Sequence, residues 1–490
     1  MTDTILVLDE GTTSTRAVLF DPHGRALRTV QAELTQHYPG PGRVEHDASE
    51  IWDKTLACAR EAVADDAGSI AAIGIANQRE TVVAWDGKSG EPLAPAIVWQ
   101  DRRSAADCAR LKEAGHEKAV QRATGLLLDP YFSATKMAWL LRENEAVRGA
   151  ADAGTLMLGT VDSWLAYKLT GAHLTDASNA SRTSLLPLDG AGFDEGLCEL
   201  FGVPSDTLPR VVDTHGRLGE AAPEWFGRPI PLCAMLGDQQ AATIGQACLA
   251  AGDTKATYGT GAFVLTNRGH AVPRSANRLL STVLTQSNGE RSYALEGSIF
   301  VAGSLIQWLR DSLGMLDSAQ ETETLARSVA DSGGVTIVPA LAGLGAPHWL
   351  PEARAAITGL TFATGKAEIA RAALEAMAHQ TCDLASAFER DGARWTGLAV
   401  DGGMSANDWM VQDVADMLDL EVARPAYVET TALGAAMAAA AGAGLYAGLE
   451  QAAAAMGSER TVFRPKMEKP LRDRRLAAWR RALIAVQTAN

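Results

Sequence analysis

Two short turns of this sequence combine glycine with hydroxyl side chains, the residue types that hold phosphate groups. The first turn spans residues 9–14 (DEGTTS), and the second spans residues 258–261 (YGTG). Glycine lets the backbone approach an anion closely, while successive N–H groups and threonine or serine hydroxyls form a concave nest of donors. One such turn by itself is more typical of an ordinary hairpin, but the pair favours phosphate binding.

Each turn lies between two strand-like runs. Residues 5–8 and 17–20 flank the first turn, and residues 254–257 and 263–266 flank the second. Such runs around a short glycine-containing turn predict a β-hairpin. The same device in both halves of the chain indicates an internal duplication.

A third phosphate-type element follows later in the chain. Residues 398–400 lead into the turn 401–403 (DGG) and then into a helix that we expect to begin near Asn407, with Ser405 and Asp408 supporting its start. The N-terminus of such a helix can hold a phosphate. Residues 368–388 carry apolar side chains at steps of three and four, which predicts one amphipathic helix. Strand-like and helix-like segments alternate, which favours an α/β fold.

The commoner nucleotide-binding motifs are absent. A Walker-type loop ending at Gly87-Lys88-Ser89 would need a glycine where Val82 stands. Gly259 and Gly261 begin a dinucleotide-type pattern, but Val264 takes the place of its third glycine and a strand follows instead of a helix. The sequence therefore excludes a Walker ATPase and disfavours a dinucleotide fold.

Length and charge narrow the class of protein further. A chain of 490 residues exceeds one ordinary core, so two domains of roughly 240 residues are expected. The net charge of −15 argues against a nucleic-acid partner. Six widely spaced cysteines suggest neither a zinc motif nor a disulfide framework, and no signal-like segment opens the chain, so we expect a cytoplasmic protein.

One uncharged stretch, residues 432–449, has the length of a short membrane span. It consists almost entirely of alanine and glycine, which favour lipid only weakly, so we expect no integral membrane association. A buried helix is the better interpretation. Small residues at Ala432, Gly434, Ala436 and Ala440 would let this helix lie close to a sheet or another helix.

Ordered segments along nearly the whole chain resemble the FGGY carbohydrate kinases of the actin-like ATPase superfamily, and among them the glycerol kinases. In the first half the matching segments are 9–16, 38–39, 44–47, 74–81 (GIANQRET), 97–100 (IVWQ) and 129–133 (DPYFS). In the second half they are 237–240 (GDQQ), 258–261 (YGTG), 307–310 (QWLR), 343–349 (GLGAPHW) and 401–403 (DGG).

The resemblance implies two ribonuclease H-like domains that face each other across a catalytic cleft. Residues 1–247 would form the polyol-binding domain and residues 248–490 the ATP-binding domain. The implied activity is ATP-dependent phosphorylation of glycerol to sn-glycerol 3-phosphate, with Mg²⁺ accompanying ATP. Contact of both turns with one triphosphate would couple binding to closure of the cleft, which excludes water.

The resemblance also implies the residues that hold the polyol. These are Arg79, Glu80, Trp99, Tyr131, Asp238, Gln239 and Phe263. The adjacent Arg79 and Glu80 offer five donors beside a two-oxygen acceptor, although an isolated Arg-Glu pair is more typical of a solvated surface. Asp238 matches the catalytic base, which orients the attacking hydroxyl and accepts its proton late.

A second group of matching residues would surround ATP. Thr12, Thr13, Ser14 and Arg16 of the first turn and Thr260 of the second match positions around the β- and γ-phosphates. Gly303, Gln307, Gly403 and Asn407 match positions near the nucleotide. Asp9 is the implied magnesium ligand, since Mg²⁺ commonly uses one or two carboxylates together with phosphate oxygens and water.

The sequence departs from the family's pattern at the first turn, where Glu10 replaces the usual glutamine. The extra negative charge would repel ATP or help to hold the metal. Alternatively, the Glu10 side chain points away from the site. The loop before Pro231 lacks the basic, glycine-rich run with which some bacterial members bind fructose 1,6-bisphosphate, so regulation by that sugar is not expected.

Two alternatives stay open at this point. An FGGY kinase could act on another small polyol or sugar, although Arg79 and Glu80 with Trp99 and Tyr131 favour glycerol. A protein of a different class, an actin-like ATP-driven binding or assembly protein, would share the fold without needing an acceptor site. The sequence leaves the oligomeric state open, with a homo-oligomer among the options.

Overall fold

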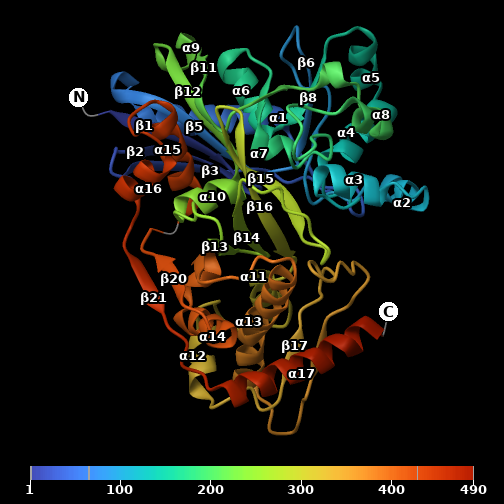
Figure 1. Ribbon diagram of the computed structural model, residues 1–490, viewed down its shortest axis with the longest axis vertical. Coiled ribbons are helices and arrows are strands. Elements are labelled where there is room, and N and C mark those ends of the chain that lie inside the picture. The colour runs from blue at the N-terminus through green and yellow to red at the C-terminus, as the bar shows by residue number, and fades with distance from the viewer. Residues whose placement is uncertain (1–2, 65–66, 428, 489–490) are drawn as a thin grey trace.

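Two mixed β-sheets, one in each half of the chain, form the centre of the computed structural model, which describes residues 3–64, 67–427 and 429–488 (Figure 1). The first sheet has the spatial order β11 (His215–Ala221), β12 (Ile230–Gly237), β5 (Ile70–Asn77), β1 (Thr4–Glu10), β2 (Ser14–Phe20) and β3 (Ala26–Glu33). The second has the order β15 (Leu280–Ser287), β16 (Glu290–Ile299), β14 (Ala262–Gly269), β13 (Thr254–Tyr258), β19 (Leu398–Asp401), β20 (Val422–Pro425) and β21 (Arg460–Phe463).

The two sheets repeat one pattern of strand directions. In the first, β1 pairs antiparallel with β2 and parallel with β5, and β5 pairs parallel with β12. In the second, β13 pairs antiparallel with β14 and parallel with β19, and β19 pairs parallel with β20. Both predicted hairpins are therefore confirmed, and the repeated pattern supports the predicted duplication.

Smaller sheets and helices surround these two sheets. The remaining strands are β4 (Glu45–His46), β6 (Val82–Asp86), β7 (Ala96–Ile97) and β8 (Leu156–Thr160) in one sheet, with the pairs β9 (Leu174–Asp176) and β10 (Arg210–Val212), and β17 (Thr336–Val338) and β18 (Ala356–Thr358). The helices of the first half are α1 (Ala48–Val63), α2 (Ala105–Glu113), α3 (Glu117–Thr124), α4 (Ser133–Glu143), α5 (Glu145–Asp152), α6 (Val161–Thr170), α7 (Ala177–Ala180), α8 (Glu195–Phe201), α9 (Pro223–Phe226) and α10 (Asp238–Gly245). Those of the second half are α11 (Gly303–Gln307), α12 (Glu321–Ser328), α13 (Lys366–Arg390), α14 (Asp408–Leu418), α15 (Thr430–Gly442), α16 (Leu449–Met456) and α17 (Lys469–Thr488).

Strand β1 is apolar on both faces because both faces are covered. Leu6 and Leu8 pack into the cluster that contains α1 residues, whereas Ile5 and Val7 pack into the cluster that contains α15 residues. A strand that is buried on both sides has a continuous run of hydrophobic residues rather than alternating apolar and polar residues. The amphipathic helix predicted over 368–388 is confirmed as α13, whose apolar face enters the core of the second half.

The alanine-rich stretch forms a buried helix, as predicted, but a shorter one. Helix α15 ends at Gly442, and α16 begins only at Leu449. In Figure 1, α15 lies beside β1 of the first sheet, and it also packs on β5 and β12, although it comes from the second half of the chain. A Cβ atom on Gly434 would stand 1.8 Å from the carbonyl oxygen of Ala241 in α10, so the two helices cross with their backbones in contact. The domain boundary near residue 248 stays a prediction.

Two expectations from composition can be compared with the described residues. Within 3–64, 67–427 and 429–488, no helix combines the length and the apolarity that a bilayer crossing needs. All six cysteines lie in these ranges, and each is buried and unpaired.

Candidate active site

The first turn sends two neighbouring carboxylates to opposite faces of the sheet, because side chains alternate along a strand. Glu10 points toward α1, where Thr55 Oγ1 donates to its Oε2 at 2.9 Å. Burial raises the pKa of Glu10 to about 8, despite hydrogen bonds from Thr15 and Thr55. Of the three outcomes considered for Glu10, the structure shows that it points away from the phosphate turn.

Asp9 lies on the other face, and its carboxylate accepts no hydrogen bond from the described residues. Its nearest cation is Arg16, whose Nη1 lies 3.7 Å from Asp9 Oδ2 and 2.5 Å from Glu429 Oε2. Burial raises the pKa of Asp9 to about 7, with Arg16 acting against it and Glu429 and Asp238 adding to it. Two carboxylates from distant parts of the chain thus share one guanidinium beside the first turn.

Arg79 and Glu80 are buried rather than solvated. They are 3% and 1% exposed, which rules out the surface interpretation of this pair. Glu80 has φ of 63°, a left-handed conformation that is uncommon for a residue with a Cβ atom and that is often found at functional sites. Ser133 Oγ donates to the Glu80 carbonyl oxygen at 3.1 Å and helps to hold this conformation.

Two charged residues that sequence reasoning missed complete this cluster. Glu296 of β16, in the second half, accepts from Arg79 Nη1 at 2.5 Å and from Arg182 Nη2 at 3.0 Å. Arg182 Nε in turn donates to Glu80 Oε1 at 2.6 Å. Burial alone would raise the pKa of Glu296, but Arg182 and Arg79 outweigh it and hold the pKa at about 2. A lone charge inside the apolar run of β16 was the signal that could have found Glu296.

Three aromatic side chains form the predicted apolar wall and come from both halves. The ring of Trp99 lies edge-on to Tyr131 at 5.7 Å and to Phe263 at 6.4 Å between centroids. The indole N–H of Trp99 donates to Thr12 Oγ1 at 2.9 Å, which links the wall to the first turn. Because Phe263 follows the second turn in β14, the wall also contacts the second half.

Asp238 is the first residue of α10 and lies against the Arg79 side chain. Arg79 Nε is 3.2 Å from Asp238 Oδ1, which also accepts from the backbone N–H of Gln239 at 2.7 Å. The Asp238 side chain is 33% exposed, so it is open to a substrate. Gly237 makes this approach possible, because a Cβ atom there would stand 2.6 Å from Arg79 Cδ.

Gln239 contacts a second residue that the sequence did not indicate, Lys255 of β13. Lys255 Nζ donates to Gln239 Oε1 at 2.5 Å, and Lys255 is completely buried. The structure therefore brings together all seven predicted polyol residues and adds Arg182, Glu296 and Lys255 to them.

The second turn is held by backbone contacts on two sides. The N–H groups of Gly303 and Ser304, at the start of α11, donate to the carbonyl oxygens of Gly259 and Thr260 at 2.9 and 3.1 Å. On the other side, Gly402 has φ of 84°, and a Cβ atom there would stand 2.6 Å from the Tyr258 carbonyl oxygen. The two predicted phosphate elements of the second half, the turns 258–261 and 401–403, thus lie together with the start of α11.

The predicted nucleotide residues differ in how free their side chains are. Thr13 of the first turn, together with Thr260 and Gln307, is exposed, while Ser14 is buried. Gly403 is exposed and has open space where a Cβ atom would lie. Asn407 caps α14 by accepting from Met410 N at 3.0 Å, so this residue is the helix start that the sequence predicted.

The donor set beside the first turn fits one magnesium ion bound together with phosphate. The Asp9 carboxylate accepts no hydrogen bond from the described residues, so its oxygens are free to bind a cation. Across the described ranges no group of three or more His, Cys, Asp or Glu side chains could hold a metal by itself. A single carboxylate is adequate for Mg²⁺ when phosphate oxygens and water supply the other ligands.

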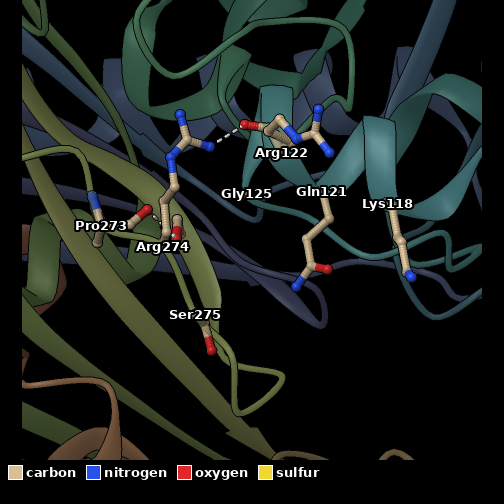
Figure 2. Close-up of a pocket in the computed structure, with 8 residues that line it drawn as sticks. Lys118, Gln121, Arg122, Gly125, Pro273, Arg274 and Ser275 are labelled. Atoms are coloured by element: carbon tan, nitrogen blue, oxygen red, sulfur yellow. Dashed lines mark hydrogen bonds between the residues drawn. The ribbon is translucent and has the colours of Figure 1, made fainter.

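A separate pocket lies where α3 faces the segment before β15, and its volume is about 260 Å³. Figure 2 shows Lys118 and Gln121 extending from α3, while Arg274 on the opposite wall donates to the carbonyl oxygen of Arg122. The residues that line this pocket include none of the predicted site residues. It is therefore distinct from the candidate active site.

Comparison with known proteins agrees with this geometry. The N-terminal domain of the FGGY family of carbohydrate kinases matches residues 4–245, and the C-terminal domain of that family matches residues 254–443. The chain is 52% identical to the glycerol kinase of Rhodospirillum rubrum over 98% of both chains, and 52% identical to that of Alcanivorax borkumensis over 98% of both.

Solved structures give the same result. A crystal structure of Plasmodium falciparum glycerol kinase with ADP superposes with a TM-score of 0.93 at 33% identity, covering 99% of this chain and 98% of that one. A xylulose kinase from Rhodospirillum rubrum shares the fold, with a TM-score of 0.87 at 23% identity and 99% of each chain covered. The chain therefore belongs to the FGGY family of carbohydrate kinases, and within that family it groups with the glycerol kinases.

Proposed function

We propose that this protein transfers the γ-phosphoryl group of ATP to a hydroxyl of glycerol and releases ADP and sn-glycerol 3-phosphate. The observation that carries the proposal is the buried Arg79–Glu80 pair beside Asp238, with Arg79 Nε 3.2 Å from Asp238 Oδ1. This arrangement gives a small polyol both hydrogen-bond donors and acceptors next to a carboxylate that can take a proton.

Asp238 is the residue that we assign as the base. It orients the attacking hydroxyl and accepts its proton as the new oxygen–phosphorus bond forms and the bond to the β-phosphate oxygen breaks. Arg79 holds the Asp238 carboxylate in place, because the Arg79 guanidinium is itself bound by Glu296. Trp99, Tyr131 and Phe263 cover the carbon chain and keep water from the reacting groups.

The triphosphate lies between the two turns in this proposal. Thr12, Thr13, Ser14 and Arg16 contact it from the first half, and Thr260, Gly303, Gln307, Gly403 and Asn407 contact it from the second. Asp9 would hold Mg²⁺, which when bound neutralises charge on the phosphates. A phosphoryl donor of this kind and six unpaired cysteines fit a cytoplasmic location, which we include in the proposal.

Glycerol is preferred to a sugar because of relatedness as well as geometry. The relatives at 52% identity over 98% of the chain are glycerol kinases, whereas the likeness to a sugar kinase at 23% identity concerns the fold alone. An actin-like assembly protein would have no reason to bury Arg79 and Glu80 beside Asp238.

The test is release of ADP from Mg-ATP in a coupled assay. It compares no acceptor, glycerol, dihydroxyacetone, erythritol, xylulose and ribulose, with Asp238→Asn in parallel and the exposed Asp152→Asn as matched control. We expect turnover with glycerol that falls by about 10²–10⁴-fold in Asp238→Asn and is unchanged in Asp152→Asn. Faster turnover with another acceptor would make that acceptor the substrate. ADP release that depends neither on an acceptor nor on Asp238 would overturn the kinase assignment.

A further inference from the structure

Lys255 is a lysine without a carboxylate in contact. It is completely buried, and within the described part of the chain no acidic oxygen lies within 4.0 Å of its ammonium group. Its direct partners are neutral: Gln239 Oε1 at 2.5 Å and Thr257 Oγ1 at 2.9 Å. Burial lowers the pKa of Lys255, while Asp401 and Asp238 act against this from a greater distance. Such an ammonium group is costly to bury, so stability alone does not account for it.

The face of the strand on which Lys255 lies shows where it acts. In β13, Ala256 and Tyr258 point into the core of the second half, and Lys255 and Thr257 point the other way. On that side Lys255 meets α10, which begins at Asp238. A side chain from the second half thus reaches the residues that we assign to the polyol.

The chemistry of an ammonium group fixes the direction of Gln239. An ammonium group has three donors and no acceptor, so it must face the amide oxygen of Gln239 rather than its nitrogen. The amide NH₂ of Gln239 is therefore turned away from Lys255. Within the described residues that NH₂ group donates to nothing, so its hydrogen-bonding capacity is left for a ligand.

Glu80 shows the complementary arrangement. Its Oε1 accepts from Arg182 Nε at 2.6 Å, and its Oε2 accepts from no described residue. The cluster therefore offers one free amide donor and one free carboxylate acceptor. A polyol hydroxyl can donate to one group and accept from another, which matches this pair.

We propose that Lys255 is a positioning residue of the polyol site: it holds the Gln239 carboxamide so that its NH₂ group donates to a substrate hydroxyl. This inference rests on the proposed function, because it assumes a polyol next to Asp238. In this proposal Lys255 does not touch the substrate. A residue of the second half thus decides which end of the Gln239 amide faces the polyol.

Gln239→Glu tests the direction of the amide. The carboxylate keeps the shape and pairs with Lys255, so the protein stays folded, but the NH₂ donor is lost. We expect KM for glycerol to rise about 10–100-fold, because a substrate hydroxyl oxygen loses its donor and is left unsatisfied, while KM for MgATP changes less than about twofold. An unchanged or lower KM for glycerol would mean that Gln239 presents its oxygen to the polyol, and would overturn the proposal.

A double-mutant cycle tests the role of Lys255. Lys255→Met removes the ammonium group at similar length, Gln239→Ala removes the amide, and the exposed Lys88→Met is the control, with KM for glycerol unchanged. We expect Lys255→Met to raise KM for glycerol about 10-fold or more alone, but by less than about twofold in the Gln239→Ala background.

Each other result has a definite meaning. Full effects in both backgrounds would show that Lys255 acts independently of Gln239 and would overturn the proposal. So would a lower melting temperature with unchanged KM for glycerol. If Lys255→Met does not fold, Gln239→Glu decides the question. Absence of glycerol-dependent turnover in the wild type would instead contradict the proposed function.

Discussion

The two glycine turns occupy equivalent places in two sheets that repeat one pattern of strand directions, yet they are anchored by different chemistry. Glu10, just before Gly11, receives a hydrogen bond from Thr55 of α1 at 2.9 Å. Tyr258, just before Gly259, meets Thr381 of α13 at 2.7 Å. Both side chains are buried under their turns. One anchor is a titratable acid and the other a neutral phenol.

The same comparison holds for the side chains on the opposite face. Asp9 lies two residues before Gly11 and offers free carboxylate oxygens, whereas Thr257 lies two residues before Gly259 and accepts from Lys255 at 2.9 Å. The repeated backbone therefore positions different groups in each half. Two charged residues of the second half, Glu296 and Lys255, lie in the site of the first half, so neither half contains the whole site.

Breaking the contact between the halves at Glu296 should have the largest effect. Glu296→Gln leaves Arg79 and Arg182 without their shared carboxylate, and loss of one partner from a buried ion pair typically costs about 3–5 kcal/mol. We expect a loss of stability of this size in urea unfolding together with a raised KM for glycerol. Glu290→Gln, at the exposed start of the same strand, should change neither. Wild-type behaviour of Glu296→Gln would show that the Glu296 carboxylate is not needed to hold Arg79 and Arg182.

Replacing the acidic anchor should remove a pH dependence. The pKa of Glu10 rises from 4.5 to about 8 on folding, so the native protein holds a proton that the unfolded chain has released between these values. Stability therefore falls as pH rises through this window, by at most roughly 1.4 kcal/mol per pH unit, and stays low above it.

Glu10→Gln lacks this titration and resembles a permanently neutral Glu10. We expect its stability relative to the wild type to grow from pH 4.5 to about 8 and then to level off, as measured by urea unfolding at several pH values. The exposed Glu113→Gln should show no such trend. A constant difference across the window would mean that Glu10 keeps an ordinary pKa in the folded protein.

Gly434 tests the helix crossing that joins the halves. A Cβ atom there would stand 1.8 Å from the Ala241 carbonyl oxygen, so Gly434→Ala forces α15 away from α10. Overpacking of this kind typically costs about 1–3 kcal/mol, which thermal unfolding would detect. Gly149→Ala, where a Cβ atom meets nothing within 4 Å, is the control. If both variants unfold alike, the close crossing is not needed.

Removing the neutral anchor should have the smallest effect. Tyr258→Phe loses one hydrogen bond to Thr381, while Thr381 keeps its own bond to the Met377 carbonyl oxygen at 2.7 Å. We expect a loss of about 1 kcal/mol that does not depend on pH between 5 and 9. A loss that varied with pH would contradict the contrast between the phenol and the acid.

Local features of the fold were predictable because they depend on neighbouring residues. The two hairpins and the helix α13 follow from runs of apolar residues, turn glycines and a helical period. The end of α15 at Gly442 was not predicted, since an uncharged alanine-rich stretch carries no clear stop signal before Gly444, which has φ of 77°.

By itself, the sequence determined the two phosphate-type turns, the α/β class and the family, and its resemblance to that family supplied the seven residues that we propose for the polyol. Only the tertiary structure decided that Glu10 points away from the turn and that Arg182, Glu296 and Lys255 join the polyol cluster. Glu296 lies 217 positions from Arg79 along the chain, so their contact depends on how the two sheets pack rather than on any local pattern. A charged side chain can be buried only where partners compensate it, and these partners come together only in the folded protein.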